Sequence, residues 1–351
     1  MTLNQLEHTK NSRLKILGLA LTILGLGLFG YFIYEAGIEE IWDGINRLGF
    51  GFLLIVVLYA FKLATRAGAW KLSLEKPYSL GFFNAYRAVI MGEALTAIIP
   101  LGILTSGTTK AVAVRKQLPL VVGLSSVAIE NLFYSLATAV LFLSGGMMFL
   151  FLFHPTGNAA LASYALIALV FAAIIGGFLM VIYEWRFASN FANWLYNRNL
   201  ATRLLHSGRA QVLHFENLIY GFYRHQPQRF LPILLLETAF HTLGILEVWI
   251  ILDAISDVRI SFGTALLLDS VNHIILFTFK LIPFALGVDE AGARYITDTL
   301  AIGAGVGVTL AIIRKGRVLF WTILGMLLVA RSGLSWKEVT SAVNETQEAK
   351  A

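Results

Sequence analysis

Four polar residues share one apolar stretch in the second half of the chain: Asp269, Asn272, His273 and Lys280. At 100° per residue, His273 lies about 40° and Lys280 about 20° from Asp269 around a helix, which makes one polar stripe. Ionisable groups at membrane depth cost about 2.5–3.5 kcal/mol each, so they should be paired and turned away from lipid. The stripe could hold an anionic headgroup or relay protons, or it could be a salt-bridged stripe that holds helices together.

Proline and glycine interrupt one apolar segment in each half of the chain. We expect broken-helix hinges at Pro100 and Gly102 in the first half, and at Pro283 and Gly287 in the second. A pair of interrupted apolar segments in corresponding positions is the sequence feature that best marks a transporter binding site. The free amides at the start of a half-helix favour phosphate and other anions, so the breaks favour a lipid headgroup as ligand.

Charged residues gather near these breaks and in the apolar spans beside them. The expected headgroup-binding residues are basic side chains and one histidine: Lys110, His273, Lys280, Arg314, Lys315 and Arg317. The residues expected to balance that charge or to couple to protons are acidic: Glu93, Glu130, Asp269 and Glu290. Glu237 and His241 lie four apart on one helical face. A hydrogen-bonded structural pair is favoured there over a metal site, because two ligands are too few.

The residue patterns of soluble enzymes are missing. The sequence contains no G-x-S-x-G elbow, no phosphate-binding loop and no H-E-x-x-H zinc motif. It also contains no cysteine, which excludes disulfides and thiolate metal sites. We therefore expect no enzyme activity, no metal and no cofactor. An intramembrane enzyme is the alternative, because His273 and Asp269 could act as a general acid–base pair.

The composition is typical of a helical membrane protein. Of the 351 residues, 57% are hydrophobic and 14% are charged, against about 25% charged in an average soluble domain. We expect an all-α, polytopic membrane protein with about seven transmembrane helices, one or two re-entrant or broken helices, and a weak inverted repeat. The formal charge of +6 fits the positive-inside rule, and nucleic acid is not expected as a partner.

Residues 1–335 are expected to form one integral membrane domain, followed by a polar tail at 336–351. Basic residues before the first apolar run and acidic residues after it predict a cytoplasmic N-terminus. The polar region 184–230 is predicted to be a cytoplasmic amphipathic segment at the lipid surface. Lys62 and Arg66 are assigned to the basic flank that ends the second span. The basic group at 314–317 fits either a loop between two spans or one helix that faces a polar cavity.

Residues 283–292 read PFALGVDEAG and resemble the P-x-x-L-G-V-x-E-G signature of the lysylphosphatidylglycerol synthase transmembrane region, also called the flippase-like domain. The resemblance covers about residues 10–335. Asp269 before the signature and the basic cluster after it are closest to the family's hopanoid-biosynthesis-associated branch. The chain departs from the family at residues 105–108, where Thr-Ser-Gly-Thr stands in place of the usual Gly-Gly-Asp/Glu.

The resemblance implies a bacterial inner-membrane protein that moves amphiphilic lipids between leaflets or serves their synthesis. The lipid substrate would be anionic or of isoprenoid or hopanoid type. A non-catalytic accessory protein in lipid, glycolipid or hopanoid biosynthesis is the other alternative, with lipid-biosynthesis enzymes as candidate partners.

Overall fold

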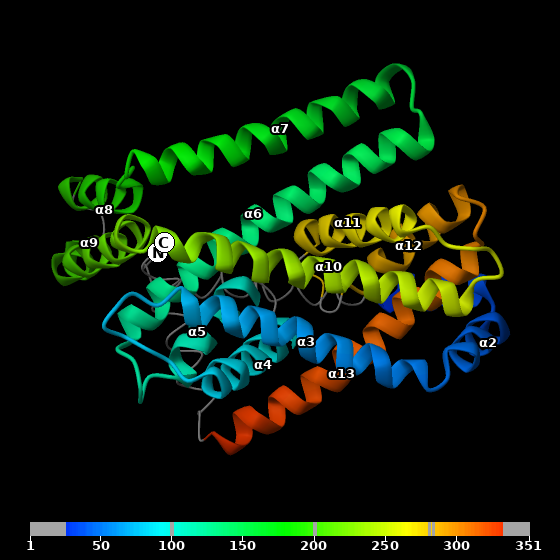
Figure 1. The fold of residues 1–351 in the computed structure, drawn as a ribbon, viewed down its shortest axis with the longest axis horizontal. Coiled ribbons are helices and arrows are strands. Elements are labelled where there is room, and N and C mark those ends of the chain that lie inside the picture. The colour runs from blue at the N-terminus through cyan, green and yellow to red at the C-terminus, as the bar shows by residue number, and fades with distance from the viewer. Residues whose placement is uncertain (1–25, 99–101, 199–201, 280–281, 283–284, 333–351) are drawn as a thin grey trace, which may run out of the picture. The chain divides into compact units, whose positions relative to one another are not determined.

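The computed structural model describes residues 26–98, 102–198, 202–279, 282 and 285–332. In this part of the chain the regular structure is helical and contains no strand, which confirms the predicted all-α fold. Residues 26–36 are helical. The following helices, coloured from blue to red in Figure 1, are α2 (Ile38–Leu48), α3 (Gly51–Leu72), α4 (Phe82–Ile98), α5 (Gly102–Ala113), α6 (Leu120–Phe153), α7 (Gly157–Ile182), α8 (Phe187–Asn197), α9 (Thr202–His225), η1 (Pro227–Arg229), α10 (Phe230–Ile255), α11 (Phe262–Thr278), α12 (Val288–Thr299) and α13 (Ala304–Arg331).

Several helices have the length and composition of membrane spans. Within the described residues, four are long and apolar enough to cross a membrane: Gly51–Leu72, Leu120–Phe153, Ala160–Gly177 and Pro227–Ile255. A hydrocarbon core of about 30 Å needs about 20 apolar residues in a helix. The chain is therefore a polytopic helical membrane protein, as predicted. The predicted number of crossings and the side of the N-terminus stay predictions.

The chain divides into two compact units. The first unit contains Met1–Leu58, Thr96–Gly102 and Gly244–Trp321, and the second contains Tyr59–Leu95, Ile103–Leu243 and Thr322–Ala351. Helices α3, α4, α5, α10 and α13 contribute residues to both units. Each unit contains its own cluster of buried charged side chains.

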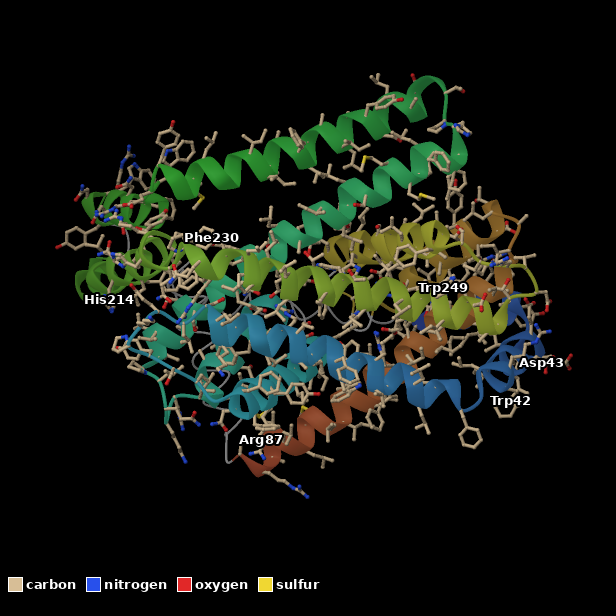
Figure 2. All side chains as sticks on the ribbon, viewed as in Figure 1. Trp42, Asp43, Arg87, His214, Phe230 and Trp249 are labelled. Atoms are coloured by element: carbon tan, nitrogen blue, oxygen red, sulfur yellow. The ribbon has the colours of Figure 1, made fainter. Side chains whose placement is uncertain are left out.

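Apolar side chains from α3, α6, α9 and α10 form the core of the second unit: Ala69, Ile129, Phe133, Phe222 and Ile233. The ring of Phe133 meets that of Phe230 edge to face at 5.5 Å, and Phe230 lies where α9 leads into α10 (Figure 2). Burying one such side chain stabilises the fold by about 1.5–3 kcal/mol. The Arg229 side chain also donates to the backbone oxygen of Leu74 at 2.7 Å, just past the end of α3. These contacts fix α9 to the apolar helices that carry the buried charges.

α6 and α7 form a long antiparallel hairpin (Figure 1). The apolar window of α7 has no buried residue, which suits a helix that faces lipid. α8 and α9 pack on each other, and the backbone N–H of Ser189 donates to Glu216 at 3.2 Å. Trp185, Phe191 and Trp194 are exposed on this pair. The region 184–230 is thus largely helical, and its place at the lipid surface stays a prediction.

In the first unit, α11, α12 and α13 pack closely because glycines let their backbones approach. A Cβ on Gly292 of α12 would lie 2.2 Å from Cδ1 of Ile275 in α11. A Cβ on Gly307 of α13 would lie 2.6 Å from the backbone of Ala293 in α12. These close approaches bring polar residues of the three helices into one cluster.

The helices end near the two predicted breaks. One break separates α4 from α5, which begins at Gly102, and the other separates α11 from α12. Gly287 precedes α12 with a φ of +79°, a left-handed conformation that favours glycine. The predicted site residues Pro100, Lys280 and Pro283 lie outside the described residues. The basic group at 314–317 lies inside the continuous helix α13, so it is not a loop between two spans.

Candidate functional site

The second unit buries two cations around one carboxylate. Glu130 of α6 is fully buried, and Arg66 of α3 reaches its Oε1 atom with Nε at 2.8 Å and Nη2 at 2.6 Å. Lys110 of α5, which is 1% exposed, places Nζ 3.4 Å from Oε2 of the same carboxylate. Each carboxylate oxygen of Glu130 is therefore paired with a cation from a neighbouring helix.

Arg66 is the centre of this charge cluster. Its Nη1 atom lies 3.2 Å from the carboxylate of Glu93 on α4, and its Nη2 atom donates to Asn131 at 3.3 Å. Its guanidinium also lies 4.4 Å from the centroid of the Tyr134 ring. An arginine can make these contacts together because its fork of donors is planar and its faces stack on aromatic rings.

Lys62 lies one helical turn before Arg66 and is also buried, with 5% exposure. Its Nζ atom lies 4.7 Å from the centroid of the Phe240 ring, a distance at which the ring attracts a cation. The prediction that Lys62 and Arg66 belong to the basic flank that ends the span is therefore wrong, because both side chains are buried within the helix. The signal was present, because residues four apart share one face of a helix that continues to Leu72.

Glycines let α5 lie close to both of its neighbours. A Cβ on Gly92 of α4 would lie 3.1 Å from the backbone oxygen of Ser106 and 3.2 Å from Cγ of Lys110. A Cβ on Gly123 of α6 would lie 3.2 Å from Cβ of Ala111. The absence of these side chains brings Lys110 within reach of the carboxylate on α6.

In the first unit, polar residues of the predicted stripe on α11 contact charged residues of α12 and α13. Arg314 Nη2 lies 3.5 Å from Asp269 Oδ1. With its amide oriented to satisfy both neighbours, Asn272 donates to Asp289 Oδ1 at 2.7 Å and accepts from Arg314 at 2.5 Å. His273 Nδ1 lies 2.9 Å from the backbone oxygen of Asp269 and 3.4 Å from its carboxylate. The described residues of the stripe are thus part of a network that spans three helices.

Lys315 and Arg317 each have an acidic partner. Lys315 Nζ lies 2.7 Å from Glu290 Oε1, and the other oxygen of Glu290 accepts from the backbone N–H of Gly287 at 2.8 Å. Glu290 therefore also satisfies an amide at the start of α12. Arg317 binds the carboxylate of Glu247 on α10. Together with Arg314, all the predicted basic residues of α13 are ion-paired in this conformation.

A small cavity adjoins this network, among Asn272, Asp289 and Arg314. Its volume of about 10 Å³ is room for a single water molecule. A phosphate headgroup is larger than this cavity. A headgroup could therefore bind here only by replacing ion pairs that now fill the site.

Comparison with protein families supplies the remaining observation. Residues 15–342 match the lysylphosphatidylglycerol synthase transmembrane region. The chain belongs to this family. The match includes both charge clusters, which therefore lie in a membrane region whose family name refers to lipid synthesis. Searches of curated proteins and of solved structures found no match.

The lysylphosphatidylglycerol synthase transmembrane fold distributes the predicted site residues between two clusters. The second unit holds Lys110, Glu93 and Glu130. The first unit holds Asp269, His273, Glu290, Arg314, Lys315 and Arg317. The sequence did not predict Lys62, Arg66, Asp289 and Glu247 as site residues. Among the described residues, no group of three or more histidine or acidic side chains could hold a metal ion.

Proposed function

We propose that this protein binds an amphiphilic lipid by its anionic headgroup and moves it between the bilayer leaflets. The observation that carries the proposal is the pair of cations, Arg66 and Lys110, buried around Glu130, with Lys110 on the helix that follows a chain break. Buried ion pairs contribute little net stability, because desolvation offsets most of their attraction. A structural role alone therefore gives little reason for such a set, whereas an anionic headgroup would find its cationic partners there.

Glu93 offers a point at which a headgroup could enter the cluster. Its side chain is 27% exposed, and its oxygen lies 3.2 Å from Arg66 Nη1. A phosphate matches the guanidinium fork at least as well as a carboxylate does, so it could displace Glu93. Arg66 and Lys110 would then share the phosphate while the apolar tails stay in the bilayer.

The first unit is proposed as a second headgroup-binding region. Arg314, Lys315 and Arg317 would be its cationic residues, and Asp269 and Glu290 would be the counter-charges that a headgroup exchanges with. The contact between Arg314 and Asp269, at 3.5 Å, is longer than that between Lys315 and Glu290, at 2.7 Å. Headgroup entry is therefore expected to begin by opening the Arg314–Asp269 contact.

The remaining features of the proposal are expectations that the sequence and its family resemblance suggest. The lipid is an anionic lipid or one of isoprenoid or hopanoid type. The protein acts without enzymatic chemistry in a bacterial inner membrane, with its N-terminus in the cytoplasm. Lipid-biosynthesis enzymes are its candidate protein partners.

Leaflet exchange of a fluorescent phosphatidylglycerol in reconstituted liposomes tests the proposal. The wild type is expected to accelerate exchange. Lys110→Ala should lower the rate about tenfold or more, because a hydrogen bond to a charged group contributes about 1.5–3 kcal/mol. Arg47→Ala is the matched control, since Arg47 forms an exposed ion pair with Asp257 at 2.6 Å outside both clusters. It should keep the wild-type rate. Exchange no faster than in protein-free vesicles, for phosphatidylglycerol and for a polyprenyl phosphate, would overturn the proposal.

A further inference from the structure

One carboxyl group in the charge cluster of the second unit takes no part in the hydrogen bonds of that cluster. Glu237 of α10 is 0% exposed, and neither of its side-chain oxygens is hydrogen-bonded to any described residue. The predicted hydrogen bond between Glu237 and His241 is therefore wrong. His241 Nε2 instead lies 3.1 Å from Thr138 Oγ1, and its ring stacks on Tyr134 at 5.3 Å. Within the described residues, Glu237 thus has neither an amide nor a hydroxyl group to stabilise a buried negative charge.

Glu237 lies in the electrostatic field of the whole cluster, beside Arg66, Lys110, Glu93 and Glu130. The titratable or charged groups that face this region come from every helix packed around it: Lys62 and Arg66 on α3, Glu93 on α4, Lys110 on α5, Glu130 and Tyr134 on α6, and His241 on α10. With Glu237 ionised, the cluster contains three cations and three carboxylates and has no net charge. With Glu237 protonated, it has one net positive charge.

We propose that Glu237 takes up one proton when the cluster binds an anionic headgroup and releases it when the headgroup leaves. The proposal rests on the lipid-binding function argued above and identifies its coupling ion. A singly charged phosphodiester bound to the neutral cluster would leave one uncompensated negative charge in a medium of low dielectric constant. Bound to the protonated cluster, it completes an electrically neutral site. The proton comes from hydronium or a buffer acid in the surrounding water. Its bond to that donor breaks, water or the buffer base is left behind, and a new O–H bond forms at a carboxylate oxygen of Glu237.

The burial of Glu237 supports this role in a second way. A neutral carboxylic acid costs far less than a carboxylate when it is buried without hydrogen bonds. The structure therefore suits a group that changes charge during a binding cycle. Glu130, which is ion-paired with Arg66 and Lys110, stays charged and holds these two cations in position.

Calorimetric titration of the full-length protein in detergent tests the proposal without requiring transport. Phosphatidylglycerol is titrated in two buffers that differ in ionisation enthalpy, which gives the number of protons taken up per lipid bound. The wild type should take up about one proton per lipid, and its affinity should fall about tenfold per pH unit once Glu237 is ionised in the free protein. Glu237→Gln, which mimics the protonated group, should take up none and bind with an affinity that does not change with pH.

Two further variants serve as controls. Glu216→Gln removes another buried glutamate, which lies outside the cluster and binds Ser189, and it should keep the wild-type proton uptake. Glu237→Asp keeps a titratable group, so it should keep uptake with a displaced pH midpoint. If Glu237→Gln does not fold, the proton uptake of Glu237→Asp and its pH midpoint test the proposal instead.

Lipid binding by the wild type without proton uptake, or unchanged uptake in Glu237→Gln, would overturn the proposal. A Glu237→Asp variant with the wild-type midpoint would overturn it as well. Soluble glycerophosphoglycerol, whose diester stays singly charged, separates a headgroup from a free anion. Proton-linked binding of this compound, together with absent leaflet exchange, would support the role of Glu237 and contradict lipid transport.

Discussion

Glu130 is the residue on which the charge cluster of the second unit depends. It is fully buried and connects α3, α5 and α6 through Arg66 and Lys110. Both cations are themselves almost completely buried, so each needs this carboxylate to offset its desolvation. The sequence placed Glu130 in an apolar helix, where the structure also has it. It placed Lys110 in a basic segment after the first break and Arg66 in a basic flank, whereas both side chains are buried.

We expect Glu130→Gln to lower the free energy of unfolding by about 3–5 kcal/mol, because it leaves two buried cations without their shared carboxylate. Thermal unfolding in detergent, followed by size-exclusion chromatography, measures the loss. Glu93→Gln is the matched control, since this partly exposed acid has one contact with Arg66 at 3.2 Å. It should cost about 1 kcal/mol or less. Equal losses in the two variants would show that the cluster is not organised around Glu130.

At the scale of helices, the packing of α13 depends on one glycine far more than on another. A Cβ on Gly307 would overlap the backbone of Ala293 at 2.6 Å, and backbone atoms cannot move aside as a side chain can. A Cβ on Gly316 of the same helix would meet the Phe52 ring at 3.5 Å, an ordinary contact. Comparing Gly→Ala at the two positions therefore distinguishes the steric cost of close helix approach from the general preference of helices for alanine.

Gly307→Ala should destabilise the protein by about 1–3 kcal/mol, the usual cost of forcing an extra group into a packed interface. Gly316→Ala should be neutral or stabilising by up to about 1 kcal/mol, because alanine favours the helix more than glycine does. Unfolding temperatures of the two variants, measured side by side, test this difference. A loss at Gly316 as large as that at Gly307 would contradict the close approach of α12 and α13.

The helices also show where sequence reasoning succeeds and where it stops. Proline and glycine predicted both breaks, because their backbone preferences are local properties of the chain. The continuity of α13 through Arg314, Lys315 and Arg317 could not be predicted. Local hydropathy treats these residues as a polar interruption. Their acidic partners, which lie up to 70 residues away, keep them inside one helix.

At the scale of the whole molecule, composition was enough to predict a polytopic helical membrane protein. The two compact units could not be predicted, because the first unit joins Met1–Leu58 to Gly244–Trp321 across residues 59–243, most of which belong to the other unit. Such pairings arise from packing and from long-range ion pairs, which leave no periodic pattern in the sequence. The pairing of Arg66 with Glu130 was missed for the same reason.

An ion pair joins the N-terminal segment of the first unit to α12. Arg294 of α12 donates to Glu35 at 2.6 Å across 259 residues, and its guanidinium also lies 5.7 Å from the ring of Phe32. The hydrogen bonds from Arg294 and from Tyr31 lower the pKa of Glu35 from 4.5 to about 2. A carboxyl group with a lowered pKa stabilises the folded state above its unfolded value, and this contribution is lost as the pH falls toward the folded value.

The unfolding temperature of the wild type should therefore fall between about pH 4.5 and pH 2 more steeply than that of Glu35→Gln, which has no charge to lose. Thermal unfolding in detergent across this range measures the two slopes. Glu39→Gln, which removes an exposed acid from the first turn of α2, is the matched control and should keep the wild-type slope. If Glu35→Gln and Glu39→Gln give the same slope, Glu35 does not link the N-terminal segment to α12. Other contacts, such as the packing of Ile41 against Val308 and the Arg47–Asp257 pair, then hold the segments of the first unit together.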